Sequence, residues 1–152
     1  MMWNRRKGVI FAIGGGLLAP CITLHLAAQG QPSPITITRI FTGRDNRTHS
    51  EQVQVKFVPA LDGTEQSDFK VTNLRFFRWR PGHVNDWHPA PQKQYVITLS
   101  GRGEVEIGDG EKIAMEPGRI ILAEDVTGKG HITRTIGNEV WVRVTIPLAD
   151  QR

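Results

Sequence analysis

The stretch that decides the fold is residues 82–101, which read GHVNDWHPAPQKQYVITLSG. Five residues separate Gly82 from His88, and six separate Gln94 from Gly101. A second histidine, His131, follows a glycine, Gly128, after two intervening residues. These spacings are hard to explain by core packing alone. We therefore expect His88, Gln94 and His131 to face one common space, and the following observations indicate what encloses it.

Alternation of apolar and polar side chains with a period of two surrounds this stretch. Residues 53–57 and 140–146 both show it, and turn dipeptides such as Pro117-Gly118 separate the runs. Such short alternating runs indicate β-strands in a sandwich or barrel. We predict an all-β domain over residues 35–152. Its expected core consists of Val53, Val55, Phe57, Leu74, Phe76, Val96, Ile97, Leu99, Val105, Ile107, Ile121, Val140, Val142 and Val144.

Residues 81–135 resemble the cupin superfamily. The residues that match its two motifs are Gly82, His88, Gly101, Gly128 and His131. Four positions depart from the motifs: Ala90 replaces a histidine, Gln94 a glutamate, Val126 a proline and Thr135 an asparagine. The resemblance is to small single-domain bacterial cupins of the RmlC-like kind. It implies a double-stranded β-helix, also called a jelly-roll barrel, which here follows a segment at residues 1–28 with the layout of an N-terminal signal or anchor.

The resemblance also raises the question of a metal, because cupins usually hold Fe, Mn, Ni or Zn with three histidines and one glutamate. This chain keeps His88 and His131 and offers the neutral amide of Gln94 in place of the carboxylate. Such a set leaves the charge of a divalent transition metal uncompensated unless an acidic residue also contacts the metal. Two alternatives stay open: a metal site, and a histidine pair that binds a ligand without metal. Additional candidates for this pocket are His83, Asp86, Trp87, Tyr95, Glu124 and Asp125.

Three function classes follow from these residues. The first is a small-molecule-binding cupin with a degenerate metal site, which Ala90 and Gln94 favour. The second is a metal-dependent dioxygenase, isomerase or lyase, which the retained histidine pair favours. The third is a structural or partner-binding module. Arg75, Arg78 and Arg80 form either a solvated strand face or a clamp for an anionic ligand.

The first 28 residues have the layout of an export signal or membrane anchor. A basic start at residues 4–7 precedes an apolar run rich in small residues, and the arginine pair resembles a twin-arginine signal. Residues 29–34 are expected to be a linker. The protein is therefore expected in the periplasm or outside the cell, or else anchored through residues 1–28. The single cysteine, Cys21, lies in the same segment, which excludes disulfides and thiolate chemistry from the rest of the chain.

Charge argues against nucleic acid as a partner. The chain has 19 basic and 15 acidic residues, but residues 1–28 contain Arg5, Arg6 and Lys7 and no acid. The rest is nearly neutral and lacks the basic excess of a nucleic-acid binder. The partners expected instead are a small molecule and a second copy of the chain. We expect a homodimer in which residues 35–41 lie at the interface, because a barrel must protect its edge strands.

Overall fold

The computed structural model describes residues 33–149. The predicted export segment, residues 1–28, lies outside this range, and so does most of the linker. The described residues contain β-strands and no helix, so none of them forms a helix that could cross a membrane. The strands are β1 (Thr36–Thr42), β2 (Thr48–Gln54), β3 (Val58–Pro59), β4 (Glu65–Gln66), β5 (Arg75–Trp79), β6 (Val84–His88), β7 (Gln94–Ser100), β8 (Gly103–Glu106), β9 (Lys112–Met115), β10 (Ile120–Glu124), β11 (His131–Thr135) and β12 (Trp141–Pro147).

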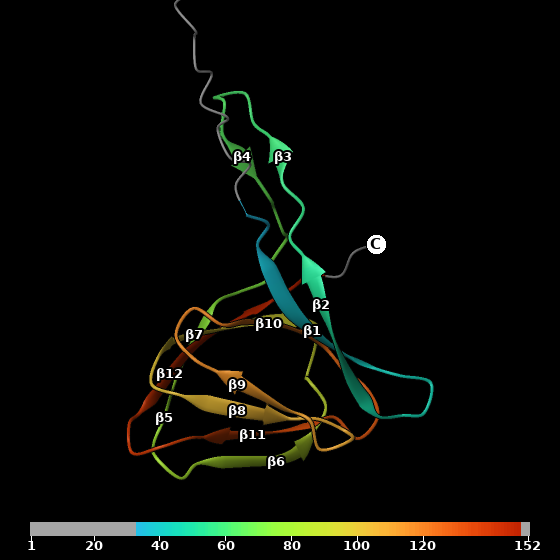
Figure 1. Cartoon of the computed structure of the whole chain (residues 1–152), viewed down its shortest axis with the longest axis vertical. Helices are drawn as coiled ribbons and strands as arrows, with labels where there is room; N and C mark the ends of the chain where they lie inside the picture. The colour runs from blue at the N-terminus through green and yellow to red at the C-terminus, as the bar shows by residue number, and fades with distance from the viewer. Residues whose placement is uncertain (1–32, 150–152) are drawn as a thin grey trace, which may run out of the picture. The chain divides into compact units, whose positions relative to one another are not determined.

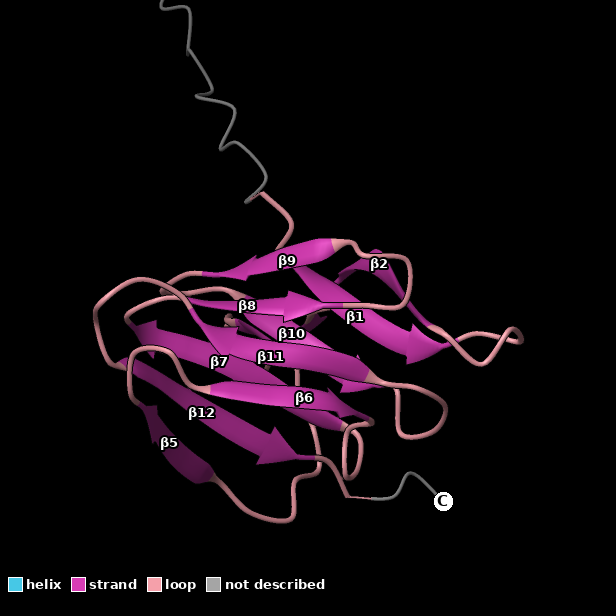
Figure 2. Cartoon of the chain, turned by 90° about the horizontal axis from the view of Figure 1, so that it is seen from below, coloured by secondary structure: helices cyan, strands magenta, loops and turns pink. Residues whose placement is uncertain are grey.

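Two facing sheets form the barrel. The larger has six strands in the order β2-β1-β10-β7-β12-β5, and the smaller has four in the order β6-β11-β8-β9. Figure 2 shows them as two layers, and the short β3–β4 hairpin extends away from both in Figure 1. Only β1 and β10 pair in parallel; the other pairings within the described residues are antiparallel. This arrangement confirms the predicted all-β jelly roll.

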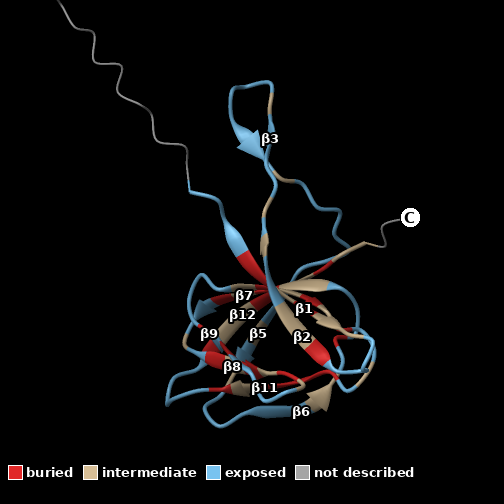
Figure 3. Ribbon diagram, turned by 45° about the vertical axis from the view of Figure 1, so that its right-hand side comes forward, coloured by how far each residue is buried: buried red, intermediate tan, exposed pale blue. Residues whose placement is uncertain are grey.

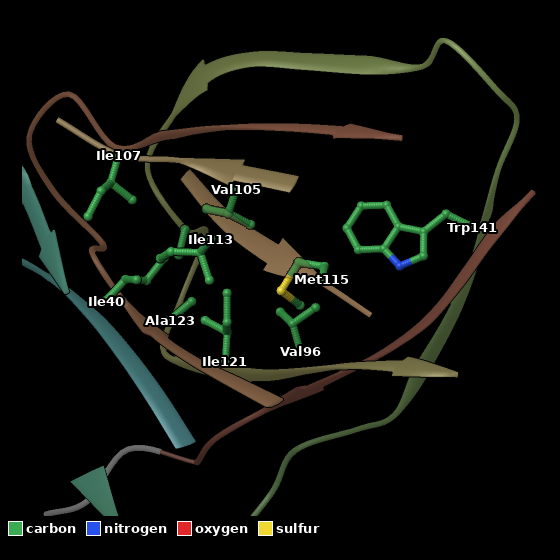
Figure 4. Close-up of a cluster of buried hydrophobic side chains, with 10 residues drawn as sticks. Ile40, Val96, Val105, Ile107, Ile113, Met115, Ile121, Ala123 and Trp141 are labelled. Atoms are coloured by element: carbon green, nitrogen blue, oxygen red, sulfur yellow. The ribbon is translucent and has the colours of Figure 1, made fainter. Parts of the chain in front are cut away.

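The core lies in the space between the two sheets. Its buried members come from both layers, and burial is concentrated inside the barrel (Figure 3). Burying apolar area in this way contributes about 25 cal/mol per Å² to folding. Figure 4 shows how these side chains point toward one another from opposite walls. The cluster consists of Ile40, Ala90, Val96, Val105, Ile107, Ile113, Met115, Ile121, Ala123 and Trp141.

The predicted core was only partly right. Val96, Val105, Ile107, Ile121 and Val144 are buried, whereas the exposed residues among those predicted are Phe57, Leu74, Phe76, Leu99 and Val140. The error arises because the larger sheet carries apolar side chains on its outer face too. Ile97 and Ile146 belong to an apolar surface groove there. Alternation shows that a strand has two faces, but it does not show which face is the inner one.

Trp141 is the largest fully buried side chain. Its indole Nε1–H donates to Oγ1 of Thr98 at 3.2 Å, and its ring lies edge-on to Trp79 at 5.5 Å between centroids. A Cβ added at Gly103 would lie 2.5 Å from this ring, so only glycine lets β8 approach it. Trp141 therefore joins the two sheets at one end of the barrel.

The strand expected at a dimer interface has no free edge. β1 pairs with β2 on one side and β10 on the other, so only its outer face is open to a partner. The edge strands of the larger sheet are β2 and β5. The homodimer stays a prediction.

Candidate functional site

His88 and His131 are direct neighbours. His88 ends β6 and His131 begins β11, and the two residues are paired in the register of these antiparallel strands. Their ring centroids are 4.5 Å apart with an angle of 56° between the planes. The two histidines lie on adjacent strands of the smaller sheet, so backbone pairing sets their separation.

Gly130 makes this close pairing feasible. Its φ is +74°, in the left-handed region that glycine alone adopts freely. A Cβ at this position would lie 2.0 Å from the backbone oxygen of His88. The sequence Gly128-Lys129-Gly130 therefore turns tightly enough to start β11 directly against the end of β6.

Hydrogen bonds at both ring nitrogens hold His88 in one neutral form. Nδ1–H donates to the backbone oxygen of Asp86 at 2.7 Å, and Nε2 accepts from the amide of Asn85 at 3.0 Å. Burial lowers the pKa of His88 below its ordinary value, and the neighbouring His131 and Arg143 act in the same direction. His88 is thus set up as a neutral hydrogen-bonding group.

A pH titration tests this assignment. Because the folded state resists protonation of His88 while the unfolded chain protonates near pH 6.5, its contribution to stability is complete above about pH 6.5 and falls as the pH drops below that value. We expect the NMR titration midpoint of His88 to lie below 6.5. A midpoint at or above 6.5 would contradict the described environment.

His131 is oriented by a buried carboxylate. Its Nδ1–H donates to Oδ2 of Asp125 at 2.6 Å, and the same oxygen accepts from the hydroxyl of Thr48 at 3.1 Å. Asp125 is fully buried, and its second oxygen, Oδ1, has no hydrogen-bond partner among the described residues. Asp125 does not line the cavity described below, so it lies behind His131. Its position leaves Nε2 as the nitrogen with which His131 can contact a ligand.

Both histidines line a cavity of about 350 Å³ inside the barrel. One part of its wall is apolar and contains Val96, Met115 and Ile121. Another part is aromatic and contains Phe77, Trp79 and Trp141. The polar lining residues are Arg75, Asn85, His88, Gln94, His131, Thr133, Arg143 and Thr145. No Asp or Glu of the described residues lines this cavity, so its fixed charges are those of the two arginines.

The structure brings Gln94 to this cavity with the two histidines, although the prolines at 89 and 91 interrupt the strand between them. It brings none of the six additional candidates there. His83 packs on Trp79 with ring centroids 4.2 Å apart. The carboxylate of Asp86 accepts from the backbone N–H of Trp87 at 2.8 Å, so it is engaged in a local turn.

The remaining candidates also lie outside the cavity. The ring of Trp87 lies beneath the ammonium of Lys129 at 3.6 Å, and Tyr95 packs edge-on to Phe69 at 5.1 Å. Glu124 pairs with Arg39 and Lys93, and the hydrogen bond from Arg39 helps lower the pKa of Glu124 against the opposing effect of burial. Glu124 is therefore neutralised within the chain rather than offered to the cavity.

Sequence reasoning missed Arg143, Asn85 and Thr145. The valines at 140, 142 and 144 were expected to face inward, which placed Arg143 on the solvent face. A register irregularity follows Val142 where β12 pairs with β7, and Trp141, Arg143 and Thr145 are the residues that line the cavity. The alternation along residues 140–146 was recognised, but the valines were assigned to the inner face. Assigning the other set of residues to the inner face would have identified Arg143 and Thr145. Of the three arginines considered as an anion clamp, only Arg75 lines the cavity.

Comparisons with known proteins give structural similarities only. No family model and no curated protein matches the chain. A protein of unknown function from Streptococcus pyogenes is 20% identical over 52% of this chain, with a TM-score of 0.43; the match spans 65% of that protein, slightly less than two thirds. An RmlC-like cupin protein from Desulfovibrio desulfuricans is 14% identical, with 81% of this chain and 97% of that one covered and a TM-score of 0.39.

An enzyme also occurs among the similar structures. The dTDP-6-deoxy-D-glucose-3,5-epimerase RmlC from Legionella pneumophila, solved with dTDP-4-keto-L-rhamnose, is 12% identical, with 75% of this chain and 73% of that one covered and a TM-score of 0.40. The fold itself is read from the strands. With a six-stranded and a four-stranded sheet facing each other, and β6 and β11 side by side, residues 33–149 have a jelly-roll fold.

Proposed function

We propose that this protein is a small-molecule-binding cupin whose ligand occupies the barrel cavity between the histidine pair and the aromatic wall. The observation that carries the proposal is the cavity itself. It is about 350 Å³ in volume, mostly apolar, and has a few polar groups directed to one space. Cavities of this size and composition are typical of small-molecule sites.

The residues of the cavity fit a resident divalent metal poorly. Two neutral histidines and one amide bring no negative charge, and Arg75 and Arg143 line the same space. The Nε2 lone pair of His88 already accepts a hydrogen bond from Asn85. These residues therefore support a degenerate metal site rather than a complete one.

One observation favours a second candidate function, a metal-dependent cupin enzyme. A carboxylate that accepts from the Nδ1–H of a histidine, as Asp125 does from His131, is the usual support of a metal-ligating imidazole. Metal analysis of the purified, tag-free protein separates the two candidates. The binding-protein proposal predicts substoichiometric transition metal, and a stoichiometric metal would favour the enzyme.

NMR detection of small-molecule binding tests the proposal directly. Trp79 and Trp141 both line the cavity, so their indole N–H signals should shift when a neutral or charged organic compound enters. Trp87 does not line it and serves as the internal control. If no compound of any charge moves the Trp79 and Trp141 signals, the cavity is not a small-molecule site.

Replacing Gln94 by glutamate should convert the site toward metal binding. The substitution adds a carboxylate to the cavity wall beside the histidine pair. We expect Zn²⁺ or Mn²⁺ affinity, measured by calorimetry, to rise by about 10-fold or more. Gln92→Glu, at an exposed position that lines a different pocket, is the matched control and should leave affinity unchanged. Equal affinities for the two variants would show that position 94 does not reach the histidines' space.

Replacing Ala90 by histidine, the residue that the cupin motif has at this position, is not a suitable way to raise metal affinity further. Ala90 is 2% exposed and belongs to the core cluster, and its backbone N–H donates to the backbone oxygen of Asp125. A histidine at this position would overpack the core.

We also propose that the protein is exported, on the strength of residues 1–28 alone. The basic start and the small-residue run support cleavage near residue 28. N-terminal sequencing of the native protein should find a chain that begins close to that position in the periplasm or the medium. A chain that begins at Met1 or Met2 in the cytoplasm would contradict export.

A further inference from the structure

Arg143 is a cation enclosed by aromatic rings inside the barrel. Its guanidinium carbon lies 4.1 Å from the ring centroid of Trp79, 4.9 Å from that of Phe77 and 5.2 Å from that of Trp141. Burial lowers the pKa of Arg143 to about 10, so the group still carries its charge near neutral pH. The rings cover apolar and π surface of the guanidinium but supply no acceptor for its N–H groups.

No carboxylate of residues 33–149 forms an ion pair with this charge. Among the described residues, the ion pairs of Arg39, Lys93, Lys112 and Arg134 each use a glutamate, and Arg143 takes part in none. Its Nε is buried and has no hydrogen-bond partner in the same part of the chain. A buried cation without a counter-charge is destabilising, so an anion that enters the cavity gains an interaction that the protein itself leaves unmade.

A second donor without a partner lies on the same strand. The hydroxyl of Thr145, a residue that is 4% exposed, has no hydrogen-bond partner among the described residues and lines the cavity with Arg143. Arg75 lines it as well, and it is opposite Thr145 in the β5–β12 register, where Phe77 is opposite Arg143. Arg75 and Arg143 are therefore diagonal neighbours on one wall, about 7–8 Å apart at the backbone.

We propose that the barrel cavity recognises a small organic monocarboxylate, whose carboxylate pairs with Arg143 and Thr145 while its apolar part rests on the aromatic and aliphatic walls. This inference rests on the proposed function and names the chemical class of its ligand. A planar carboxylate matches the N–H edge of a guanidinium whose faces are covered by rings. Arg143, a partly buried arginine, together with Arg75 at an exposed position, balances a single negative charge better than the double charge of a phosphate monoester.

The other lining residues suit the rest of such a ligand. Apolar contact comes from Val96 and Ile121, on the same six-stranded sheet as Arg143, and from Met115, on the four-stranded sheet. The amide of Gln94 can donate to or accept from a hydroxyl or carbonyl on the ligand, and Nε2 of His131, whose proton is on Nδ1, can accept from a hydroxyl. The volume of about 350 Å³ admits a compound about the size of a benzoate or a short branched acid.

Matched acid and amide pairs test the charge directly. The protein in its natural mature form is titrated with butyrate and butyramide and with benzoate and benzamide. Binding is monitored through the indole N–H signals of Trp79 and Trp141. We expect at least one acid to bind 10-fold or more tightly than its amide. Arg143→Gln should abolish this preference, and Arg143→Lys should keep part of it. Arg78→Gln, on an exposed residue of the same strand pair that does not line the cavity, should leave it intact.

The outcomes separate this inference from the proposed function. If the amides bind as tightly as the acids, the carboxylate assignment is wrong and the small-molecule site stands. If phenyl phosphate binds more tightly than benzoate, the site prefers a different anion and the assignment is also wrong. If neither acids nor amides move the indole signals, both proposals fail. Circular dichroism of the Arg143 variants shows whether the barrel is intact, and the wild-type comparison does not depend on them.

Discussion

Trp141→Ala should lower the free energy of unfolding by about 3–5 kcal/mol, the range for removing a large aromatic side chain from a core. The side chain is fully buried, donates to Thr98 and packs against Gly103 and Trp79. Its removal leaves a void that opens into the barrel cavity, where its ring lies beside the guanidinium of Arg143. Urea unfolding followed by circular dichroism gives the difference, and the slope with denaturant should be unchanged.

Trp87→Ala is the matched control. Trp87 is half-buried, its ring lies beneath the ammonium of Lys129, and it belongs to no part of the core cluster. We expect a loss of about 1 kcal/mol or less for this variant. Equal losses for the two tryptophans would show that Trp141 does not join the sheets as described.

Gly130→Ala should be the most damaging single-atom change near the histidine pair. The new Cβ would lie 2.0 Å from the backbone oxygen of His88 and 2.4 Å from the nitrogen of Pro89, and neither backbone atom can rotate away. The positive φ alone costs about 1 kcal/mol for alanine. Because the ends of β6 and β11 must also separate, we expect a total loss of more than about 3 kcal/mol.

Gly110→Ala isolates the backbone contribution. Gly110 has a similar φ, +88°, but a Cβ there has no neighbour within 4 Å. This control should lose only about 1 kcal/mol. If Gly130→Ala cost no more than Gly110→Ala, the close approach of Gly130 to His88 would be refuted. In a Gly130→Ala protein that still folds, the ring signals of His88 and His131 should also shift, because the spacing of their strands has changed.

Local chemistry made much of the fold predictable. Turn glycines and alternating strands point to an all-β barrel, and the spacing from Gly82 to His88 and from Gly128 to His131 marks the strands whose ends meet. The phase of the alternation was not predictable. β5 carries Phe76 and Phe77 on opposite faces, and both are equally apolar in sequence. Only pairing with β12, in which Trp79 lies opposite Trp141, determines which aromatic faces inward.

The site residues were also only partly predictable from the sequence. The histidines and Gln94 were found by spacing, which depends on backbone turns close to them in the chain. Arg143 was missed because its role depends on long-range packing against Phe77, Trp79 and Trp141. Glu124 was considered a candidate because its carboxylate could compensate the charge of a metal held by the histidines. Its engagement by Arg39, far away in the chain, removes it from consideration.

The strand order also has a consequence for folding kinetics. Thr38 of β1 lies beside Ile121 of β10, and Arg75 of β5 lies opposite Thr145 of β12, so neighbouring strands come from distant parts of the chain. All-β domains with such non-local pairing fold in milliseconds to seconds, because long loops must close before contacts form. The cavity draws on strands of both sheets and exists only once the barrel has closed. A ligand therefore binds too late to accelerate folding, and its stabilising effect should appear as slower unfolding.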